Sequence, residues 1–314
     1  MNSFAEDVLK GLSANPRYLP SMYFYDEAGD RLFKEITKLE EYYLTRCEEE
    51  ILNNQKEKML QCFSPDGAGF NLIELGPGDG LKSRILLEYL KKYQVDFEYF
   101  PIDISDNVLS LLEKNLSRKL PGLKIHSMNM DYFKALDELH RFTHKPSIVL
   151  FLGSNIGNFK HQESVNFLKA LHEKIDDDDR LLIGMDLKKD AKLILAAYDD
   201  KKGITRDFNL NYLQRINREL RGEFLPEHFF HKAVYDQESG EAKSFLVSKC
   251  KHEVYIGALD QTFVFDKNEA IFMEVSKKFD GYSIEQLAAE TGFRVEQYFY
   301  DNSRYFTNVI WRKV

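Results

Sequence analysis

Short apolar runs alternate with amphipathic stretches through the middle of the chain. The runs expected to form strands are Asn71–Leu75, Phe97–Ile102, Ile125–Met128, Ile148–Leu152 and Leu181–Asp186. Between them, three stretches place apolar residues three and four positions apart, as amphipathic helices do: Leu81–Lys92, Asn107–Leu116 and Gln162–Lys174. Strands that are short and largely apolar are typical of a parallel sheet covered by helices on both faces. The pattern therefore predicts an α/β fold.

The pattern changes after Asp186. Helices are expected at Ala191–Tyr198, Leu210–Leu220 and Lys278–Thr291. Antiparallel strands are expected at Glu227–Asp236, Lys243–Ile256 and Gln261–Phe265, with a closing strand pair at Arg294–Tyr300 and Thr307–Lys313. The N-terminal segment is expected to be mostly helical. We expect residues 56–189 and 281–314 to form the sheet domain, and residues 1–55 and 190–280 to pack together as a second, lid-like lobe.

Charge and cysteine content narrow the class of protein. The formal net charge is −8 over 314 residues, and the basic residues are dispersed, so nucleic acid is not an expected partner. Cys47, Cys62 and Cys250 form no CxxC pair, which fits a reducing compartment. No apolar run approaches the roughly 20 residues of a membrane span, and the N-terminus lacks a signal-peptide core. We expect a cytoplasmic protein without a membrane partner, and take a monomer as the working assembly.

The strongest local motif is a glycine-rich turn that follows the first predicted strand. The sequence LIELGPGDG ends at Gly80, and Gly76, Gly78 and Gly80 allow the backbone to turn sharply and approach a ligand. Asp103 stands about 20 residues further on, at the end of the next predicted strand, where an acidic side chain can bind ribose hydroxyls. The motif predicts a nucleoside-containing cofactor.

Two features separate the possible cofactors. The turn is followed by Leu81 and Lys82 rather than by the small residues that suit a pyrophosphate at a helix start. Asp131 follows the third predicted strand, where it can accept from an adenine amino group. Two acidic positions, without small residues at the helix start to bind a pyrophosphate, favour S-adenosylmethionine (SAM) over NAD. The alternative is that Asp103 and Asp131 are ordinary turn residues at strand ends.

Six segments carry a resemblance to a known family. They are YFYDEAGDRLFKEITKLEEYYLTR (23–46), IELGPGDGLKSR (73–84), PIDIS (101–105), LFLGSNIGNF (150–159), AAYDDKKGITRDFNLNYLQRINREL (196–220) and EVSKKF (274–279). With these segments the chain resembles the histidine-specific N-α-methyltransferases of ergothioneine biosynthesis. The resemblance implies a class I SAM-dependent methyltransferase with a Rossmann-like sheet. It also implies that L-histidine is trimethylated on its α-amino group to hercynine, with S-adenosylhomocysteine as the second product and no metal.

The resemblance also implies roles for individual residues. Around SAM it places Tyr25, the three turn glycines, Lys82 near the carboxylate, Asp103 on the ribose, and Asp131 with Tyr132 at the adenine. The substrate side comprises Phe33, Tyr42, Gly153, Asn158, Tyr198, Thr205, Ser244, Glu274 and Ser276. Tyr42, Asn158 and Tyr198 would hold the amino acid's carboxylate and amine, and Glu274 with Ser276 would bind the imidazole nitrogens. Tyr25 and Asn158 are the candidates for the catalytic step, with Tyr25 or a water chain as a conceivable base.

Each substrate residue has an alternative explanation. Tyr42 can be a core aromatic, and Asn158 can cap the helix that begins near Gln162. Glu274 and Ser276, two positions apart, can lie on a solvated strand face. Ser244 stands where family members carry methionine, which would reshape the side-chain pocket. The functional alternatives are the same chemistry on tyrosine, tryptophan or a derivative, a methyltransferase for protein or nucleic acid, and a binding module without catalysis.

Two histidine pairs have spacings that a metal can use. They are His140 with His144 and His228 with His231. Neither pair has an evident third ligand in the sequence. We therefore predict that no histidine of this chain binds a metal.

Overall fold

The chain folds into two compact units. The computed structural model describes residues 3–142 and 145–314, apart from the side chains of residues 140–142, so the His140/His144 pair lies outside the described residues. Unit 1 comprises Met1–Tyr43 and Lys189–Lys277, and unit 2 comprises Leu44–Lys188 and Lys278–Val314. The first boundary differs from the expected position after residue 55, because one helix, α3 (Tyr43–Phe63), runs across that position.

Unit 2 contains a seven-stranded sheet in the order β12-β13-β6-β5-β2-β3-β4. Its strands are β2 (Phe70–Leu75), β3 (Phe97–Asp103), β4 (Met128–Asn129), β5 (Ser147–Phe151), β6 (Arg180–Asp186), β12 (Phe293–Tyr300) and β13 (Phe306–Lys313). Neighbouring strands from β6 to β4 are parallel, whereas β13 is antiparallel to both β6 and β12. The α/β class predicted from the sequence, with a Rossmann-like sheet, is confirmed.

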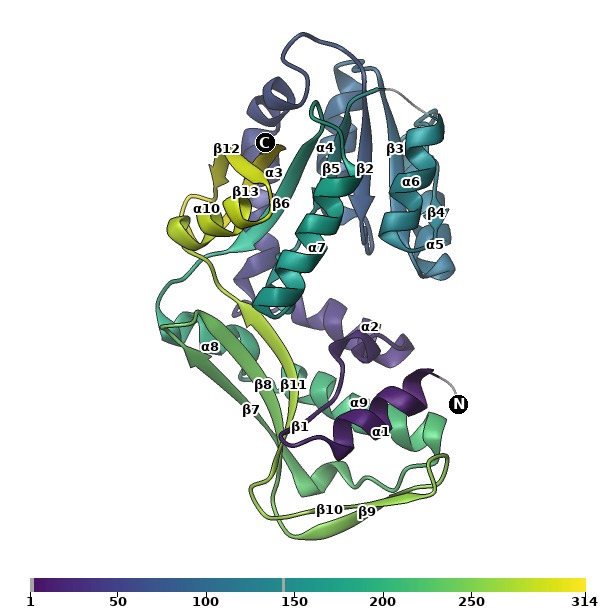
Figure 1. Ribbon diagram of the computed structural model, residues 1–314, viewed down its shortest axis with the longest axis vertical. Helices are drawn as coiled ribbons and strands as arrows, with labels where there is room; N and C mark the ends of the chain where they lie inside the picture. The colour runs from purple at the N-terminus through teal and green to yellow at the C-terminus, as the bar shows by residue number, and fades with distance from the viewer. Residues whose placement is uncertain (1–2, 143–144) are drawn as a thin grey trace. The chain divides into compact units, whose positions relative to one another are not determined.

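Helices cover both faces of this sheet. They are α3, α4 (Leu81–Lys92), α5 (Asp106–Lys119), α6 (Tyr132–Phe142), α7 (His161–Lys174) and α10 (Gly281–Glu290). In Figure 1, α6 and α7 lie in front of the sheet and α4 behind it. Ile73 and Leu75 of β2 belong to the same buried cluster as Val165 and Leu168 of α7. All of β2 is buried, and four of its six residues are apolar, as expected for a central parallel strand, whereas Asn71 and Glu74 are buried polar residues.

The strand order contains a point where the chain reverses direction across the sheet. From the central strand β2 the chain continues to β3 and β4 on one side, and then returns to β5 and β6 on the other. In open parallel sheets, ligands bind outside the carboxyl ends of the strands at such a switch point. The segments after β2 and β5 are therefore the first places to look for a site in unit 2.

Unit 1 is built on a four-stranded sheet in the order β1-β11-β8-β7 and a two-stranded hairpin. Its strands are β1 (Arg17–Tyr18), β7 (Phe229–Asp236), β8 (Glu241–Ser248), β9 (His252–Ile256), β10 (Gln261–Phe265) and β11 (Ala270–Lys277). Its helices are α1 (Ser3–Ser13), η1 (Ser21–Phe24), α2 (Glu27–Ile36), α8 (Ala191–Tyr198), α9 (Ile204–Leu220) and η3 (Pro226–His228). Parallel pairing of β1 with β11 incorporates the N-terminal segment into this sheet. In the core of unit 1, the N-terminal segment packs on the segment Lys189–Lys277 through a stacked pair of rings, Phe24 and Phe208, whose centroids lie 4.6 Å apart.

Three predicted elements were wrong in extent. The run Lys243–Ile256 forms two strands, because the chain turns after Ser248, whose hydroxyl donates to the carbonyl of Cys250 at 2.7 Å. The helix predicted at Lys278–Thr291 begins only at Gly281, since Asp280 is its N-cap and accepts from the amide of Ser283. In the third predicted strand, Ile125 forms only an isolated bridge with Tyr99.

Two further elements depend on contacts that periodicity does not reveal. Helix α9 starts at Ile204, ahead of the predicted start at Leu210, because the carboxylate of Asp200 accepts the amides of Ile204 at 3.0 Å and Thr205 at 2.7 Å. Strand β11, which contains Glu274 and Ser276, lies between β1 and β8.

Among the described helices, none combines the length and apolar composition of a membrane span.

Candidate functional site

The glycine turn leaves β2 at the switch point of unit 2. Gly76, Gly78 and Gly80 have φ angles of +69°, +56° and +68°. A Cβ on Gly80 would lie 2.2 Å from Leu112 Cδ1, and one on Gly76 would lie 2.8 Å from Tyr132 Oη. A Cβ on Gly78 would meet no protein atom within 4 Å. Gly76 and Gly80 therefore satisfy packing within the protein, whereas Gly78 presents open backbone that a ligand can approach.

We expect Gly78→Ala to weaken SAM binding at least 10-fold, because the added methyl group projects from this open backbone. The positive φ is expected to lower the stability of the fold by only about 1 kcal/mol. Isothermal titration with SAM measures the first effect and urea denaturation the second. Gly67→Ala is the matched control, since Gly67 also has a positive φ (+78°) and no neighbour within 4 Å of an added Cβ. If Gly78→Ala and Gly67→Ala bind SAM with equal affinity, Gly78 does not belong to the cofactor site.

Three predicted cofactor residues lie at the carboxyl ends of two strands: Asp103 ends β3, and Asp131 and Tyr132 follow β4. Asp103 accepts from the amide of Ser105 at 2.9 Å, and Asp131 from the amide of Phe133 at 3.0 Å. Burial of the phenol, and then the negative charges of Asp103 and Asp131, raise the pKa of Tyr132 to about 12. Both aspartates thus serve local turns, as the alternative explanation expected. They also act on the same phenol, beside Gly76, which fits a shared nucleoside site.

A buried ion pair links the segments after β2 and β5. Nζ of Lys82 lies 2.6 Å from Oε2 of Glu48. The same carboxylate accepts the amide of Gly153 at 2.9 and 3.0 Å. A Cβ on Gly153 would lie 3.3 Å from Nζ of Lys82. The predicted residues Lys82 and Gly153 therefore meet through Glu48, at the point where the sheet topology favours ligand binding.

Glu48 was missed by the sequence prediction. It lies on α3 and its surface is fully buried. The signal in the sequence is its position on an apolar stripe, four residues after Leu44 and three and four before Ile51 and Leu52, all of which are buried. A glutamate inside such a stripe requires a polar partner in the core. Here the partners are the ammonium of Lys82 and the amide of Gly153.

Glu74, in the strand that leads into the turn, is buried beneath it. Its carboxylate accepts from the hydroxyl of Tyr99. Burial raises the pKa of Glu74 from 4.5 to about 7, although hydrogen bonds from Tyr99 and Ser83 oppose the shift. The folded protein thus holds a proton on Glu74 at pH values where the unfolded chain has lost it.

The raised pKa predicts a stability effect with a definite sign. Between about pH 4.5 and 7, the unfolded chain has released this proton while the folded protein still holds it. The free energy of unfolding therefore falls by about 1.4 kcal/mol per pH unit in this range. Glu74→Gln keeps an acceptor for Tyr99 and removes this loss. We expect the stability of Glu74→Gln, relative to the unaltered protein, to improve by about 2–3 kcal/mol between pH 5 and pH 8 in urea denaturation. The control Glu88→Gln alters a half-exposed carboxylate on α4. If the difference in free energy of unfolding between Glu74→Gln and the unaltered protein does not change with pH, the raised pKa of Glu74 is contradicted.

In unit 1, the predicted aromatic residues form a chain of rings. Tyr25 and Phe33 meet edge to face with centroids 5.6 Å apart, and Phe33 meets Tyr42 at 6.4 Å. Tyr25 and Phe33 also pack on Phe208 of α9, at 5.9 and 6.1 Å. Tyr42 and Phe33 pack against the core of the unit. The core explanation for Tyr42 therefore holds in part, whereas Tyr25 keeps 48% of its surface exposed.

Polar residues on the sheet of unit 1 lie beside this chain of rings. Glu274 stands directly opposite Ser244 of β8, and a β-bulge at Met273 adjusts the strand just before Glu274. The hydroxyl of Tyr198 donates to Ser276 Oγ at 2.7 Å. Ser244 is 2% and Ser276 4% exposed, so this face of the sheet is not solvated. The alternative of a solvated strand face is therefore wrong for Ser276, whereas Glu274 is partly buried.

The protonation state of Tyr25 limits what it can do. Its pKa lies above the ordinary value: although 48% of the residue's surface is exposed, neighbouring protein partly desolvates the phenol, and the negative charges of Glu274 and Asp30 also disfavour the phenolate. The same electrostatic environment includes Tyr198. At neutral pH Tyr25 is a neutral phenol, which suits it for hydrogen bonding and makes it a poor general base.

The remaining predicted residues occupy the two units separately. Thr205 is buried at the start of α9, where Asp200 holds its amide. Asn158 ends the short helix η2 (Asn155–Asn158) in unit 2, and the N-cap of α7 is Lys160. The capping explanation for Asn158 is therefore wrong. Of the residues predicted for the substrate, Gly153 and Asn158 belong to unit 2, whereas Tyr25, predicted for the cofactor, belongs to unit 1.

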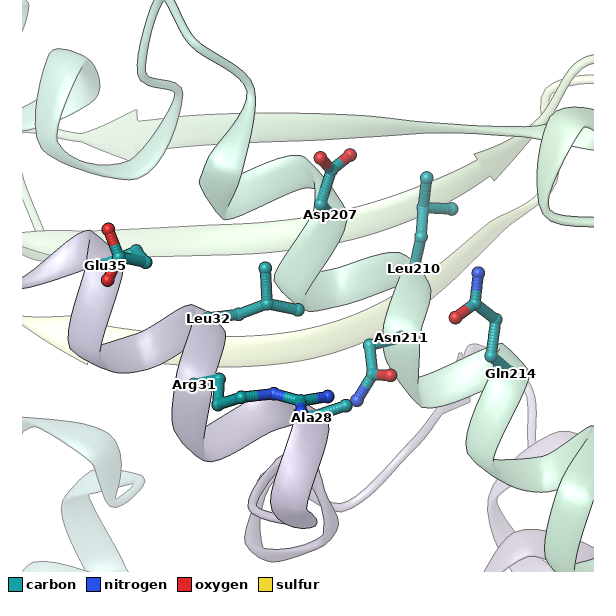
Figure 2. Close-up of a pocket in the computed structure, with 8 residues that line it drawn as sticks. All are labelled: Ala28, Arg31, Leu32, Glu35, Asp207, Leu210, Asn211 and Gln214. Atoms are coloured by element: carbon teal, nitrogen blue, oxygen red, sulfur yellow. The ribbon is translucent and has the colours of Figure 1, made fainter.

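A cavity of about 450 Å³ lies between α2 and α9 of unit 1. Figure 2 shows that its lining side chains project from these two helices. They are Ala28, Arg31, Leu32, Glu35, Asp207, Leu210, Asn211 and Gln214. None of them belongs to the predicted site, and we assign no ligand to this cavity.

Comparisons with known proteins agree over nearly the whole chain. The family described as histidine-specific methyltransferase, SAM-dependent, matches residues 4–313. A histidine N-alpha-methyltransferase of Mycobacterium tuberculosis is 37% identical over 273 residues, which cover 87% of this chain and 83% of that protein. One from Mycolicibacterium smegmatis is 33% identical over 295 residues, covering 94% and 90%. Ergothioneine biosynthesis protein 1 of Schizosaccharomyces pombe is 31% identical over 303 residues, covering 94% of this chain and 39% of that protein.

Proposed function

Because the chain belongs to the family of SAM-dependent, histidine-specific methyltransferases, we propose that it transfers methyl groups from SAM to the α-amino group of L-histidine. Three successive transfers give the trimethylated betaine, hercynine, and place the enzyme in ergothioneine biosynthesis. The observation that carries the substrate assignment is the polar group formed by Glu274, which is partly buried, with Ser276 and Tyr198, which are buried. A group of this kind rejects side chains that leave it without hydrogen bonds.

We assign Glu274 and Ser276 to the imidazole ring. A neutral imidazole has one N–H donor and one acceptor nitrogen. Glu274 accepts the N–H, and its charge strengthens the bond if the ring is protonated. The Ser276 hydroxyl, which already accepts from Tyr198, directs its own proton toward the second nitrogen. Phenylalanine or leucine offers neither group a hydrogen bond.

Unit 2 supplies the proposed SAM site. The open backbone at Gly78 receives the amino-acid part of the cofactor, and Asp103 binds the ribose hydroxyls. Asp131 and Tyr132 hold the adenine end. Lys82 is assigned to the cofactor's carboxylate, with Glu48 holding its ammonium in place. SAM itself supplies the activated methyl group.

The protein's contribution to the reaction is alignment. The α-amine attacks the methyl carbon, the bond from carbon to sulfur breaks, and S-adenosylhomocysteine leaves. Such in-line positioning can contribute about 7–11 kcal/mol to lowering the barrier. Tyr42, Tyr198 and Asn158 are assigned to the substrate's carboxylate and amine. Tyr25, as a neutral phenol, orients the nitrogen lone pair, and the proton of each amine that reacts passes to water.

A second candidate substrate is a larger aromatic amino acid, such as tryptophan, tyrosine or a derivative. Ser244 favours it, because this small, buried residue lies directly opposite Glu274 and widens the space beside it. Glu274 opposes it, because an indole satisfies the Glu274–Ser276 pair only in part. Ser244→Met, which restores the family residue, distinguishes the two: it should leave activity on histidine and abolish any activity on the larger ring.

The test measures S-adenosylhomocysteine release with three compounds supplied singly. L-histidine carries both recognised ends, histamine lacks the carboxylate, and L-phenylalanine lacks the ring nitrogens. We expect turnover with histidine and at least roughly 100-fold lower kcat/KM with either analogue. Tandem mass spectrometry should place the methyl groups on the α-nitrogen. Ring methylation, or equal turnover of phenylalanine, would refute the proposed substrate orientation.

We also infer the setting of the reaction from composition. Cys47, Cys62 and Cys250 are free thiols, which suits the reducing cytoplasm. The net charge of −8 disfavours nucleic acid as substrate. We propose a cytoplasmic enzyme that acts, as a monomer, on a free amino acid.

A further inference from the structure

Three metal-ligand side chains meet in unit 1, away from the proposed active site. His228 ends η3, and Cys250 and His252 follow β8. One ligand atom of each lies within 4.8 Å of the others. The backbone holds these segments together, because the amide of Lys249 donates to the carbonyl of His228 at 2.8 Å. Register between β7 and β8 continues this pairing at Phe229 and Ser248.

The hydrogen bonds of His252 prepare one ring nitrogen for a ligand. Its Nδ1 lies 3.0 Å from the carbonyl oxygen of Cys250 and 3.3 Å from Ser248 Oγ. A carbonyl only accepts, so Nδ1 carries the proton and Nε2 carries a lone pair. Histidines that bind metals typically donate their other N–H to a carbonyl in this way.

Two ring nitrogens at this place have no partner. His252 Nε2 and His228 Nδ1 are buried and make no hydrogen bond with any described residue. Buried nitrogens are normally satisfied, so each unsatisfied one requires an explanation. The rings meet with centroids 4.9 Å apart, and a thiol completes the group. A single cation would satisfy both nitrogens.

We propose that His228, Cys250 and His252 bind one Zn²⁺ ion, with water as the fourth ligand. Thiolate and imidazole are preferred ligands of zinc, whereas calcium and magnesium require oxygen ligands. Bond lengths of about 2.0 Å to nitrogen and 2.3 Å to sulfur place tetrahedral ligands roughly 3.5 Å apart. Since the ligand atoms lie within 4.8 Å of one another, each pair needs to approach by at most roughly 1.3 Å around the ion.

The sequence analysis paired His228 with His231 and predicted that no histidine of this chain binds a metal. In the structure, Nε2 of His231 lies 2.8 Å from the carbonyl oxygen of Tyr198. The side chains that join His228 are Cys250, in the turn after β8, and His252, the first residue of β9. Sequence spacing did not indicate this group, because Lys243–Ile256 was predicted to be one continuous strand.

The site acts on the stability of unit 1, separately from methyl transfer. Ser248 follows Ser244 by four residues along β8, a distance of about 13 Å at the usual strand rise. The ion would clamp the start of β7 to the turn after β8 without contact with Glu274. We expect bound zinc to raise the midpoint of thermal unfolding. Methyl transfer should proceed after the ion has been removed.

Cobalt spectroscopy of the full chain tests the proposal. After chelator treatment, we expect one Co²⁺ per chain, a thiolate-to-cobalt charge-transfer band, the visible bands of tetrahedral cobalt, and displacement by Zn²⁺. Cys250→Ser should lose the charge-transfer band, whereas the control Cys62→Ser, in unit 2, should retain it. Absence of the band from the unaltered protein, or its persistence in Cys250→Ser, would overturn the assignment.

A second measurement needs no substitution. The unaltered protein is treated with iodoacetamide, with and without Zn²⁺, and the cysteine peptides are quantified by mass spectrometry. We expect Zn²⁺ to slow alkylation of Cys250 at least 10-fold and to leave that of Cys62 unchanged, with Mg²⁺ having no effect. Equal alkylation of Cys250 with and without Zn²⁺ would show that the cluster holds no zinc.

Discussion

Glu274→Gln is expected to lower kcat/KM for histidine by roughly 30- to 1,000-fold, equivalent to about 2–4 kcal/mol. Glutamine keeps the shape of the side chain and a carbonyl acceptor, but it loses the charge. Charge-assisted hydrogen bonds are about twice as strong as neutral ones. Because Ser244 and Ser276 on the same face are nearly inaccessible, water is poorly placed to replace the missing interaction.

The same variant should lose discrimination between substrates. In the unaltered enzyme, phenylalanine offers Glu274 no N–H donor and histidine does, so the ratio of kcat/KM for histidine over phenylalanine should fall with Glu274→Gln. Initial rates of S-adenosylhomocysteine release at several substrate concentrations give both values. Glu253→Gln, an exposed position on β9 of the same unit, is the control. Unchanged histidine kinetics in Glu274→Gln would separate Glu274 from substrate recognition.

The largest effect on stability is expected for Lys278→Met. Nζ of Lys278 lies 2.8 Å from Oδ2 of Asp186, and both side chains are fully buried. Loss of the ammonium removes the opposite charge beside a carboxylate in the core, and breaking a buried ion pair in this way typically destabilises a protein by about 3–5 kcal/mol. Urea denaturation measures the change. Lys124→Met, which breaks the exposed pair with Glu98, should have only a small effect.

A double substitution separates the charge from the packing. Asp186→Asn combined with Lys278→Met removes both charges, so it should be more stable than Lys278→Met alone. If the double variant is the less stable of the two, the loss in Lys278→Met comes from packing rather than from the unpaired carboxylate.

Local patterns predicted the parts of the fold that local physics determines. The glycine turn was recognisable because three glycines follow a largely apolar strand, and its positive φ angles explain the choice of residue. Helix α4 and strand β10 have the predicted bounds, since hydrophobic periodicity determines them. Asp103 and Asp131 were found from their positions at the ends of predicted strands, because parallel strands bring their carboxyl ends to one edge of the sheet.

The residues that escaped prediction depend on contacts between distant segments. Glu48 acquires its role only when α3 packs beside Lys82 and Gly153. Lys278 was assigned to a helix, because no residue near it in the sequence indicates that it pairs with Asp186. A charged residue within an apolar stripe is the only warning that the sequence gives of such a pair.

The most direct test of the central claim is a competition among substrates. The purified protein is incubated with SAM and an equimolar mixture of the standard amino acids, and the products are followed over time by mass spectrometry. We expect gains of one, two and then three methyl groups on histidine alone. Methylation of another amino acid, with histidine unchanged, would contradict the assignment of Glu274 and Ser276 to an imidazole.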